Sequence, residues 1–247
     1  MTARSIMAWP QRAPPADPKP QTPSPDPGRV GSLCYKWLVL RDLPDADDVT
    51  EPEPFADADH PMRKVTREVA FEQGWSSGRA TKVAELFDSM AAGWAADHVS
   101  EERSAPVRDA LRRGGVSTAG SWIELGSGTG AGTTVLHAAV ERMVAVDLSA
   151  EMLANAVDLA PRTQADASNL PFPDDTFDGA LLVNMLLFPD EVARILRSTG
   201  SLIWVNTLGE QTPIHLSPSD VVTAMPGSWS GVTARSGMGL WAALSRT

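Results

Sequence analysis

The chain has 247 residues and a formal net charge of −10 at pH 7. This length allows one domain with an extension, or two small domains. A protein that binds nucleic acid needs clustered Lys and Arg to neutralise phosphates, so the acidic balance argues against a nucleic-acid partner. Cys34 is the only cysteine, which excludes an internal disulfide and a zinc site built from cysteines.

No apolar run reaches the roughly 18–20 residues that a membrane span requires. The N-terminal segment also lacks the apolar core of a secretory signal. We therefore expect a cytoplasmic protein with no membrane span and no metal. The sequence leaves the oligomeric state open.

Residues 1–30 are rich in proline, which fixes φ and removes a backbone donor, and this predicts an extended or disordered tail. Residues 32–40 are mostly apolar, and either a short strand or a helical turn would suit them. The acidic stretch from Asp42 to Asp59 contains no Lys or Arg and predicts a solvated linker. We expect residues 1–60 to be a largely disordered extension.

From about residue 62 the pattern becomes helical, and residues 61–118 are expected to form a helical cap. Pro106 predicts the start of a helix over 106–113, which Gly114 ends. The preceding helix has apolar residues at spacings of three and four, which predicts one buried face. These residues are Val83, Leu86, Phe87, Met90 and Trp94.

After Gly120, short apolar runs alternate with helical segments. Candidate strands are 121–125, 143–147, 162–165, 179–184, 201–206, 232–236 and 240–246, with helices at about 131–141, 150–157 and 189–197. This alternation predicts a doubly wound, mostly parallel α/β sheet of seven strands over residues 119–247. Only three residues separate the last two strands, so the final strand should be antiparallel.

The most informative motif joins the first of these strands to the next helix. Its glycines, Gly126, Gly128 and Gly130, let the backbone turn sharply and approach a ligand closely. Glu124 lies at the strand end, where its carboxylate could accept a bond from a cationic or hydroxyl group in the crevice. A tight strand-to-helix turn without a ligand is the competing interpretation.

A second apolar strand ends at Asp147, roughly 20 residues after the glycines, the spacing at which a carboxylate reaches ribose hydroxyls. Asp147 could instead simply precede a helix N-terminus. The same elements would also suit NAD. Glu124 favours a different cofactor, because a carboxylate would repel a pyrophosphate but would suit the amino and sulfonium groups of S-adenosylmethionine.

Four motifs in order resemble the class I, Rossmann-like S-adenosylmethionine-dependent methyltransferases, in particular their small-molecule branch. The motifs are Glu124-Leu125-Gly126-Ser127-Gly128-Thr129-Gly130, the run from Val146 to Leu153, Ala165-Asp166-Ala167, and the run from Leu170 to Asp178.

The resemblance implies a role for each matching residue. The loop Gly126, Ser127, Gly128, Thr129 and Gly130 would underlie the methionine and ribose portions of the cofactor, and Asp147 would hold the ribose hydroxyls. Leu148 and Met152 would flank the adenine, although core packing suits Met152 equally well. Asp166 would accept from the adenine amino group, and the Ala167 N–H would meet a ring nitrogen. Asn184 and Met185 would line the methionine side.

The resemblance also implies methyl transfer to a small-molecule acceptor by direct displacement. Two departures stand out: a Ser198-Thr199-Gly200 turn replaces Pro-Gly-Gly, and Asn184-Met185-Leu186-Leu187-Phe188 lacks the histidine of many relatives. No catalytic residue can therefore be named; His98 and His215 are conceivable bases, although surface or packing roles suit them better. A non-catalytic or regulatory S-adenosylmethionine-binding protein, or less favourably an NAD-dependent oxidoreductase, remain the alternatives.

Overall fold

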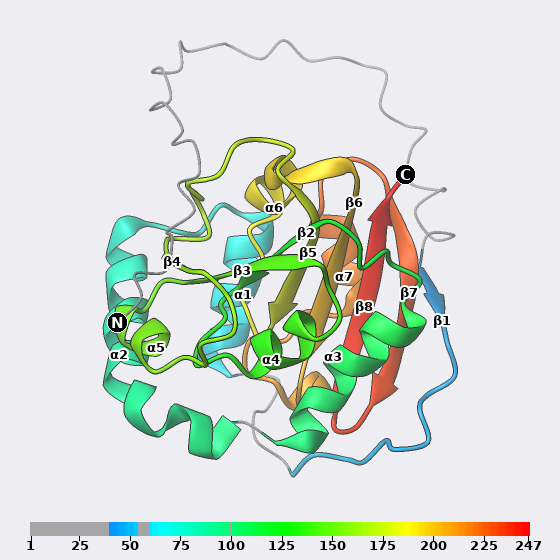
Figure 1. The fold of residues 1–247 in the computed structure, drawn as a ribbon, viewed down its shortest axis with the longest axis horizontal. Helices are drawn as coiled ribbons and strands as arrows, with labels where there is room; N and C mark the ends of the chain where they lie inside the picture. The colour runs from blue at the N-terminus through cyan, green and yellow to red at the C-terminus, as the bar shows by residue number, and fades with distance from the viewer. Residues whose placement is uncertain (1–39, 54–59, 99) are drawn as a thin grey trace.

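The structure is a computed structural model that describes residues 40–53, 60–98 and 100–247. One mixed sheet has the strand order β1-β7-β8-β6-β5-β2-β3-β4, and helices cover both of its faces (Figure 1). The strands are β1 (Leu40–Asp42), β2 (Ser121–Leu125), β3 (Arg142–Asp147), β4 (Arg162–Gln164), β5 (Phe177–Val183), β6 (Leu196–Asn206), β7 (Trp229–Ser236) and β8 (Gly239–Arg246). The helices are α1 (Pro61–Phe71), α2 (Ser77–His98), α3 (Glu101–Arg113), α4 (Ala131–His137), α5 (Ala150–Ala154), α6 (Pro189–Ile195), the 3-10 helix η2 (Gly209–Gln211) and α7 (Pro218–Ala224).

All seven predicted strands form, and the doubly wound α/β prediction is confirmed. Strands β4, β3, β2, β5 and β6 run parallel, and β8 is antiparallel to both of its neighbours, β6 and β7. The central strands are parallel because each is followed by a crossover that returns the chain over one face of the sheet.

The sheet buries an apolar layer on each face. On one face, Leu125 and Trp204 pack in a cluster with Val192 of α6 and Val221 of α7. On the other face, Trp122 and further strand residues pack with side chains of α3 and α4, which lie in front of the sheet in Figure 1. Central parallel strands are apolar on both sides because both faces are covered.

An eighth strand corrects the expected extension. Strand β1 pairs in parallel with β7, and residues 42–53 continue along that edge instead of forming a solvated linker. The Leu43 and Ala46 N–H groups donate to carbonyls of β7 at 2.9 and 3.0 Å. Asp48 accepts from Ser236 Oγ and Gly237 N at 3.0 and 3.1 Å. The acidic residues thus satisfy polar groups of the β7–β8 turn, which charge patterning alone could not reveal. Residues 1–39 lie outside the described residues.

The helical cap also departs from the prediction in two places. On α2, Leu86 and Met90 are 54% and 37% exposed, while the small residues Ala80 and Ala91 are buried. The predicted apolar face is therefore wrong at Leu86 and Met90, because α2 packs closely through its alanines. Helix α3 begins at Glu101, before Pro106, because the Ser100 hydroxyl accepts from Arg103 N and caps the helix.

Candidate functional site

The parallel strands place the predicted site residues at one edge of the sheet. The glycine turn follows β2, Asp147 ends β3, Asp166 lies beyond β4 and Asn184 follows β5. Because these four strands are neighbours and run in the same direction, their carboxyl ends meet at the edge where ligands of open α/β sheets bind.

The glycine turn is folded against the end of β3. The Gly126 and Ser127 N–H groups both donate to the Val146 carbonyl, at 2.9 and 3.0 Å. Gly128 has a φ of 53°, a left-handed conformation that glycine adopts without strain. A Cβ on Gly128 would meet only Trp94 Nε1, at 3.8 Å, so the space above this residue is open.

Ser127 adds an unsatisfied polar atom to the turn. Its hydroxyl oxygen is buried and has no hydrogen-bond partner among the described residues. Buried polar groups are nearly always satisfied, so a polar partner contributed by a ligand would suit this position. Thr129 beside it is buried, and Gly130 caps the start of α4 with a φ of 96°.

Glu124 does not lie in the open crevice that the sequence suggested. Its side chain is 1% exposed and turns beneath α4, where Thr133 Oγ1 donates to it. Burial raises the pKa of Glu124 to about 8, and the nearby charge of Asp147 acts in the same direction. The expected outward orientation is corrected because Gly132, which has no side chain, leaves room for the carboxylate inside the fold.

Asp147 faces the glycine turn. Its two carboxylate oxygens accept from Gly128 N at 2.7 Å and from Ser149 N at 2.8 Å. Each carboxylate oxygen can accept a second bond, so these contacts fix the side chain and leave acceptor capacity. Burial raises the pKa of Asp147, and the charge of Asp88 contributes to this rise.

Asp88 ties the cap to this edge of the sheet. From α2, its carboxylate accepts from Ser149 Oγ and from Glu151 N at 3.1 Å. Further along α2, about two helical turns after Phe87, the ring of Trp94 lies 5.4 Å from that of Phe87 in an edge-to-face pair. The helix therefore lies over the glycine turn and the start of α5.

Asp166 contacts a residue that sequence reasoning missed. Trp75 Nε1 lies 2.9 and 3.1 Å from the two carboxylate oxygens of Asp166, and Ser168 N donates to one of them at 2.8 Å. Ala167 is buried in a small cluster with Phe188, and Trp75 packs against that cluster. A tryptophan between two helices carries no periodic signal, so nothing in the sequence pointed to it.

The remaining predicted residues are placed as follows. Met185 lies over Gly126, where its sulfur would be 2.5 Å from an added Cβ. The Asn184 amide is engaged with Thr207, to which it donates at 2.8 Å and from which it accepts at 2.9 Å. Met152 is 1% exposed and Leu148 is half-buried, so Met152 follows its packing interpretation in this structure.

The histidines suggested as bases differ in their placement. His215 Nδ1 lies 3.0 Å from Asn206 Oδ1, beyond the carboxyl end of β6. Burial lowers the pKa of His215, and the charge of Arg63 lowers it further, so the neutral imidazole is favoured. The side chain of His98 lies outside the described residues.

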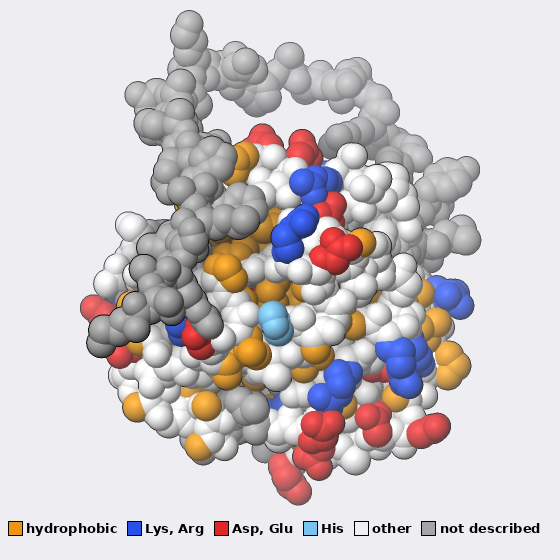
Figure 2. Space-filling view, in the orientation of Figure 1, with side chains coloured by type: hydrophobic (Ala, Val, Ile, Leu, Met, Phe, Trp, Pro, Cys, Tyr) orange, Lys and Arg blue, Asp and Glu red, His pale blue; other side chains and the backbone are white. Residues whose placement is uncertain are grey.

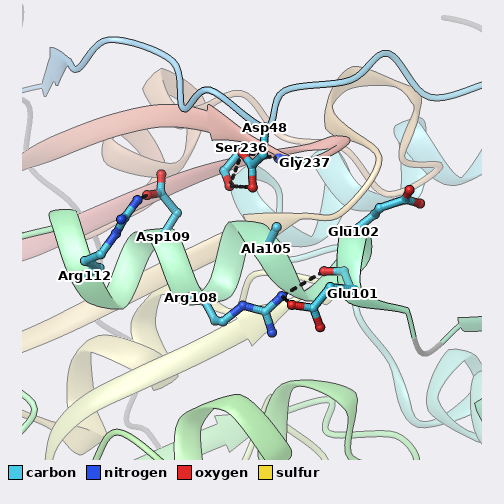
Figure 3. Close-up of a pocket in the computed structure, with 9 residues that line it drawn as sticks. All are labelled: Asp48, Glu101, Glu102, Ala105, Arg108, Asp109, Arg112, Ser236 and Gly237. Atoms are coloured by element: carbon cyan, nitrogen blue, oxygen red, sulfur yellow. Dashed lines mark hydrogen bonds and ion pairs between the residues drawn. The ribbon is translucent and has the colours of Figure 1, made fainter.

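A separate cavity of about 460 Å³ lies beside the β7–β8 turn (Figure 3). Strands β5, β6 and β8 lie between β7 and β2, so this cavity is separate from the glycine turn that follows β2. The charged side chains that line the cavity are largely paired with one another: Arg108 contacts Glu101 at 2.5 Å, and Arg112 contacts Asp109 at 3.0 Å. This cavity contains none of the predicted cofactor residues.

The distribution of surface charge and the character of the helices can be compared with the expectation of no nucleic-acid partner and no membrane span. On the face shown in Figure 2, basic side chains lie beside acidic ones rather than in a continuous stripe. Within the described ranges, no helix combines the length and the apolar character needed to cross a bilayer.

A glycine turn after the first parallel strand of the core, flanked by acids at the ends of β3 and β4, defines a Rossmann-like crevice of the class I methyltransferase type. Residues 123–203 match the family model described as "Methyltransferase domain", so the chain carries a methyltransferase domain. No curated protein sequence matches the chain.

Solved structures support the fold. A structure titled "DhpI-SAH complex structure" is 23% identical, with a TM-score of 0.57, over 69% of this chain and 98% of that one. A "DhpI-SAM-HEP complex" is 22% identical, with a TM-score of 0.55, over 70% and 100%. A SAM-dependent methyltransferase from Aquifex aeolicus is 14% identical, with a TM-score of 0.51, over 70% and 100%. At these identities the likeness establishes the fold alone.

Proposed function

We propose that this protein transfers a methyl group from S-adenosylmethionine to a small-molecule acceptor. The observation that carries the proposal is the meeting of the glycine turn, Asp147 and Asp166 at one sheet edge, inside the segment that matches the methyltransferase domain. The titles of the two DhpI structures name SAH and SAM, in agreement with this cofactor.

The residues present fit an adenosyl cofactor. Gly128 leaves open space above the turn, and the buried Ser127 hydroxyl lacks a partner among the described residues. Asp147 is held by two backbone N–H groups and retains acceptor capacity for a pair of ribose hydroxyls. Under this proposal Asp166 accepts from the adenine amino group, and Leu148, Ala167 and Met185 line the crevice.

The chain's contribution to the reaction is chiefly binding and alignment. When bound, S-adenosylmethionine supplies a methyl group that its sulfonium already activates. The protein can gain up to about 7–11 kcal/mol by orienting the acceptor for displacement. A base is required only when the acceptor carries a proton of high pKa. Our candidate for that role is His215, which contacts Asn206 at the end of β6, next to the Asn184–Thr207 contact.

Two other functions are distinguished by binding. A non-catalytic S-adenosylmethionine-binding protein would retain the cofactor site and turn over no acceptor. An NAD-dependent oxidoreductase would bind nicotinamide cofactors. Because Glu124 is buried and its pKa is raised to about 8, it no longer distinguishes the two cofactors by charge, and the binding experiment does so.

Calorimetry with S-adenosylmethionine, S-adenosylhomocysteine and NAD tests the proposal. We expect both adenosyl-sulfur ligands to bind and NAD to bind more weakly. Asp147→Ala should weaken S-adenosylhomocysteine binding at least about tenfold, roughly 1.4 kcal/mol. Asp190→Ala, at an exposed position on α6, is the matched control and should leave affinity unchanged. Preferred binding of NAD would overturn the assignment.

A further inference from the structure

The indole of Trp75 contacts Asp166, one of the residues proposed to bind the cofactor. Trp75 lies between α1 and α2, and its N–H donates to both carboxylate oxygens of Asp166, at 2.9 and 3.1 Å. Its ring meets that of Phe188 edge to face, with centroids 5.3 Å apart and an interplanar angle of 77°. The cluster it packs against also contains the buried Ala167 and Leu186.

These contacts match the chemistry expected of a bound adenine. An indole and a purine are both flat, two-ring aromatic systems with N–H donors at their edge, and Asp166 can accept from either. Asp166 and Ala167 form the short segment after β4, next to the Asp147 end of β3, where the Ala165 N–H donates to the Asp147 carbonyl at 3.0 Å. The indole and the adenine would therefore need the same acceptor, Asp166, beside the same residue Ala167.

We propose that Trp75 occupies the adenine place in the ligand-free protein and must leave Asp166 when an adenosyl ligand binds. This inference rests on the function proposed above. Trp75 then competes with the ligand for Asp166. The measured association constant equals the intrinsic association constant multiplied by the fraction of molecules in which Trp75 has left Asp166.

The loop that carries Trp75 is anchored independently of the indole. Arg79 joins its base by contacting Glu68 at 2.7 Å and by donating to the Gly74 carbonyl, and the Gly74 N–H donates to the Glu68 carbonyl at 2.9 Å. Gln73 has a φ of 54°, an uncommon conformation for a residue with a side chain. Because these contacts do not involve the ring, Trp75 can leave Asp166 while the base of the loop stays in place.

Two variants of the full chain test the inference by calorimetry with S-adenosylhomocysteine. Trp75→Phe keeps an aromatic ring against Phe188 and removes the N–H donor, and Trp75→Leu removes the two-ring system. We expect both to bind at least threefold more tightly than the wild type. Trp229→Phe is the matched control, because it also removes an indole N–H donor, which bonds to the Pro226 carbonyl at 2.9 Å, and strands β8, β6 and β5 separate its strand β7 from the glycine turn after β2. It should give no tightening.

Tryptophan fluorescence supplies a second readout. Titration with S-adenosylhomocysteine should shift the emission of the wild type and of Trp229→Phe to longer wavelength as the Trp75 indole becomes exposed to water. Trp75→Phe should show no such shift. Unchanged or weaker binding by both Trp75 variants, with ligand still bound by the wild type, would overturn the role of Trp75 alone. Absence of binding to the wild type and to all variants would overturn the proposed function, and this inference with it.

Discussion

Glu124→Gln tests whether a buried carboxyl group opposes folding at neutral pH. Glu124 is 1% exposed, and its pKa is raised from 4.5 to about 8, mainly by burial. The folded protein therefore keeps a proton on Glu124 that the unfolded chain has released, over the window from about pH 4.5 to about pH 8. Stability from this group is fully present below pH 4.5 and falls as the pH rises through that window.

The magnitude follows from the two pKa values. Each pH unit inside the window changes the free energy of unfolding by about 1.4 kcal/mol. Relative to acid conditions, the wild type should lose about 3 kcal/mol at pH 7 through Glu124. Glutamine has nearly the same shape and does not titrate, so Glu124→Gln should lack this pH dependence. An unsatisfied amide N–H would lower its stability by the same amount at every pH.

Urea unfolding at pH 5, 6, 7 and 8 measures the effect. The stability of Glu124→Gln minus that of the wild type should grow by about 3.5 kcal/mol between pH 5 and pH 8. Glu85→Gln, at an exposed position on α2, removes one carboxylate that water solvates in both states, and its difference from the wild type should stay nearly constant. A constant difference for Glu124→Gln as well would refute the burial argument.

Three further changes probe other parts of the structure. Arg194→Met should lower the free energy of unfolding by roughly 3 kcal/mol in urea titration, because Arg194 is 16% exposed and pairs with Glu191 at 2.7 Å; a loss under 1 kcal/mol would contradict this. Asp48→Ala should cost about 1 kcal/mol and lower the melting temperature, whereas Asp47→Ala, its neighbour in the sequence, should not; equal melting temperatures would show that the Asp48 bonds to the β7–β8 turn do not stabilise the fold. Gly128→Val should abolish S-adenosylhomocysteine binding in calorimetry with an unchanged circular dichroism spectrum, because a β-branched residue disfavours a φ of 53°; normal binding would place the ligand elsewhere.

Local patterns in the sequence were enough to predict the core of the fold. Apolar runs ending at Leu125 and Asp147 predicted strands because central parallel strands are buried on both faces. The glycine turn was equally predictable, because Gly126, Gly128 and Gly130 adopt positive φ values that favour glycine. The sequence signal was strongest where one residue type is required by its own backbone conformation.

Long-range contacts explain what could not be predicted. Strand β1 pairs with β7 at the other end of the chain, and the Asp48 bonds to the β7–β8 turn look like ordinary surface charges in the sequence. The inward turn of Glu124 depends on the space beneath α4, and the Trp75–Asp166 contact joins two separate segments. Each depends on tertiary neighbours that no local pattern encodes.

The pairing of β1 with β7 also imposes an order on folding. A ribosome delivers the residues of β1 long before those of β7, and loop-closure entropy delays contacts between such distant segments. The β7–β8 hairpin can form locally as soon as it is made, and β1 can join only after that. During synthesis β1 therefore remains unpaired until β7 and β8 have been made, and the pairing of β1 at this edge of the sheet is completed last.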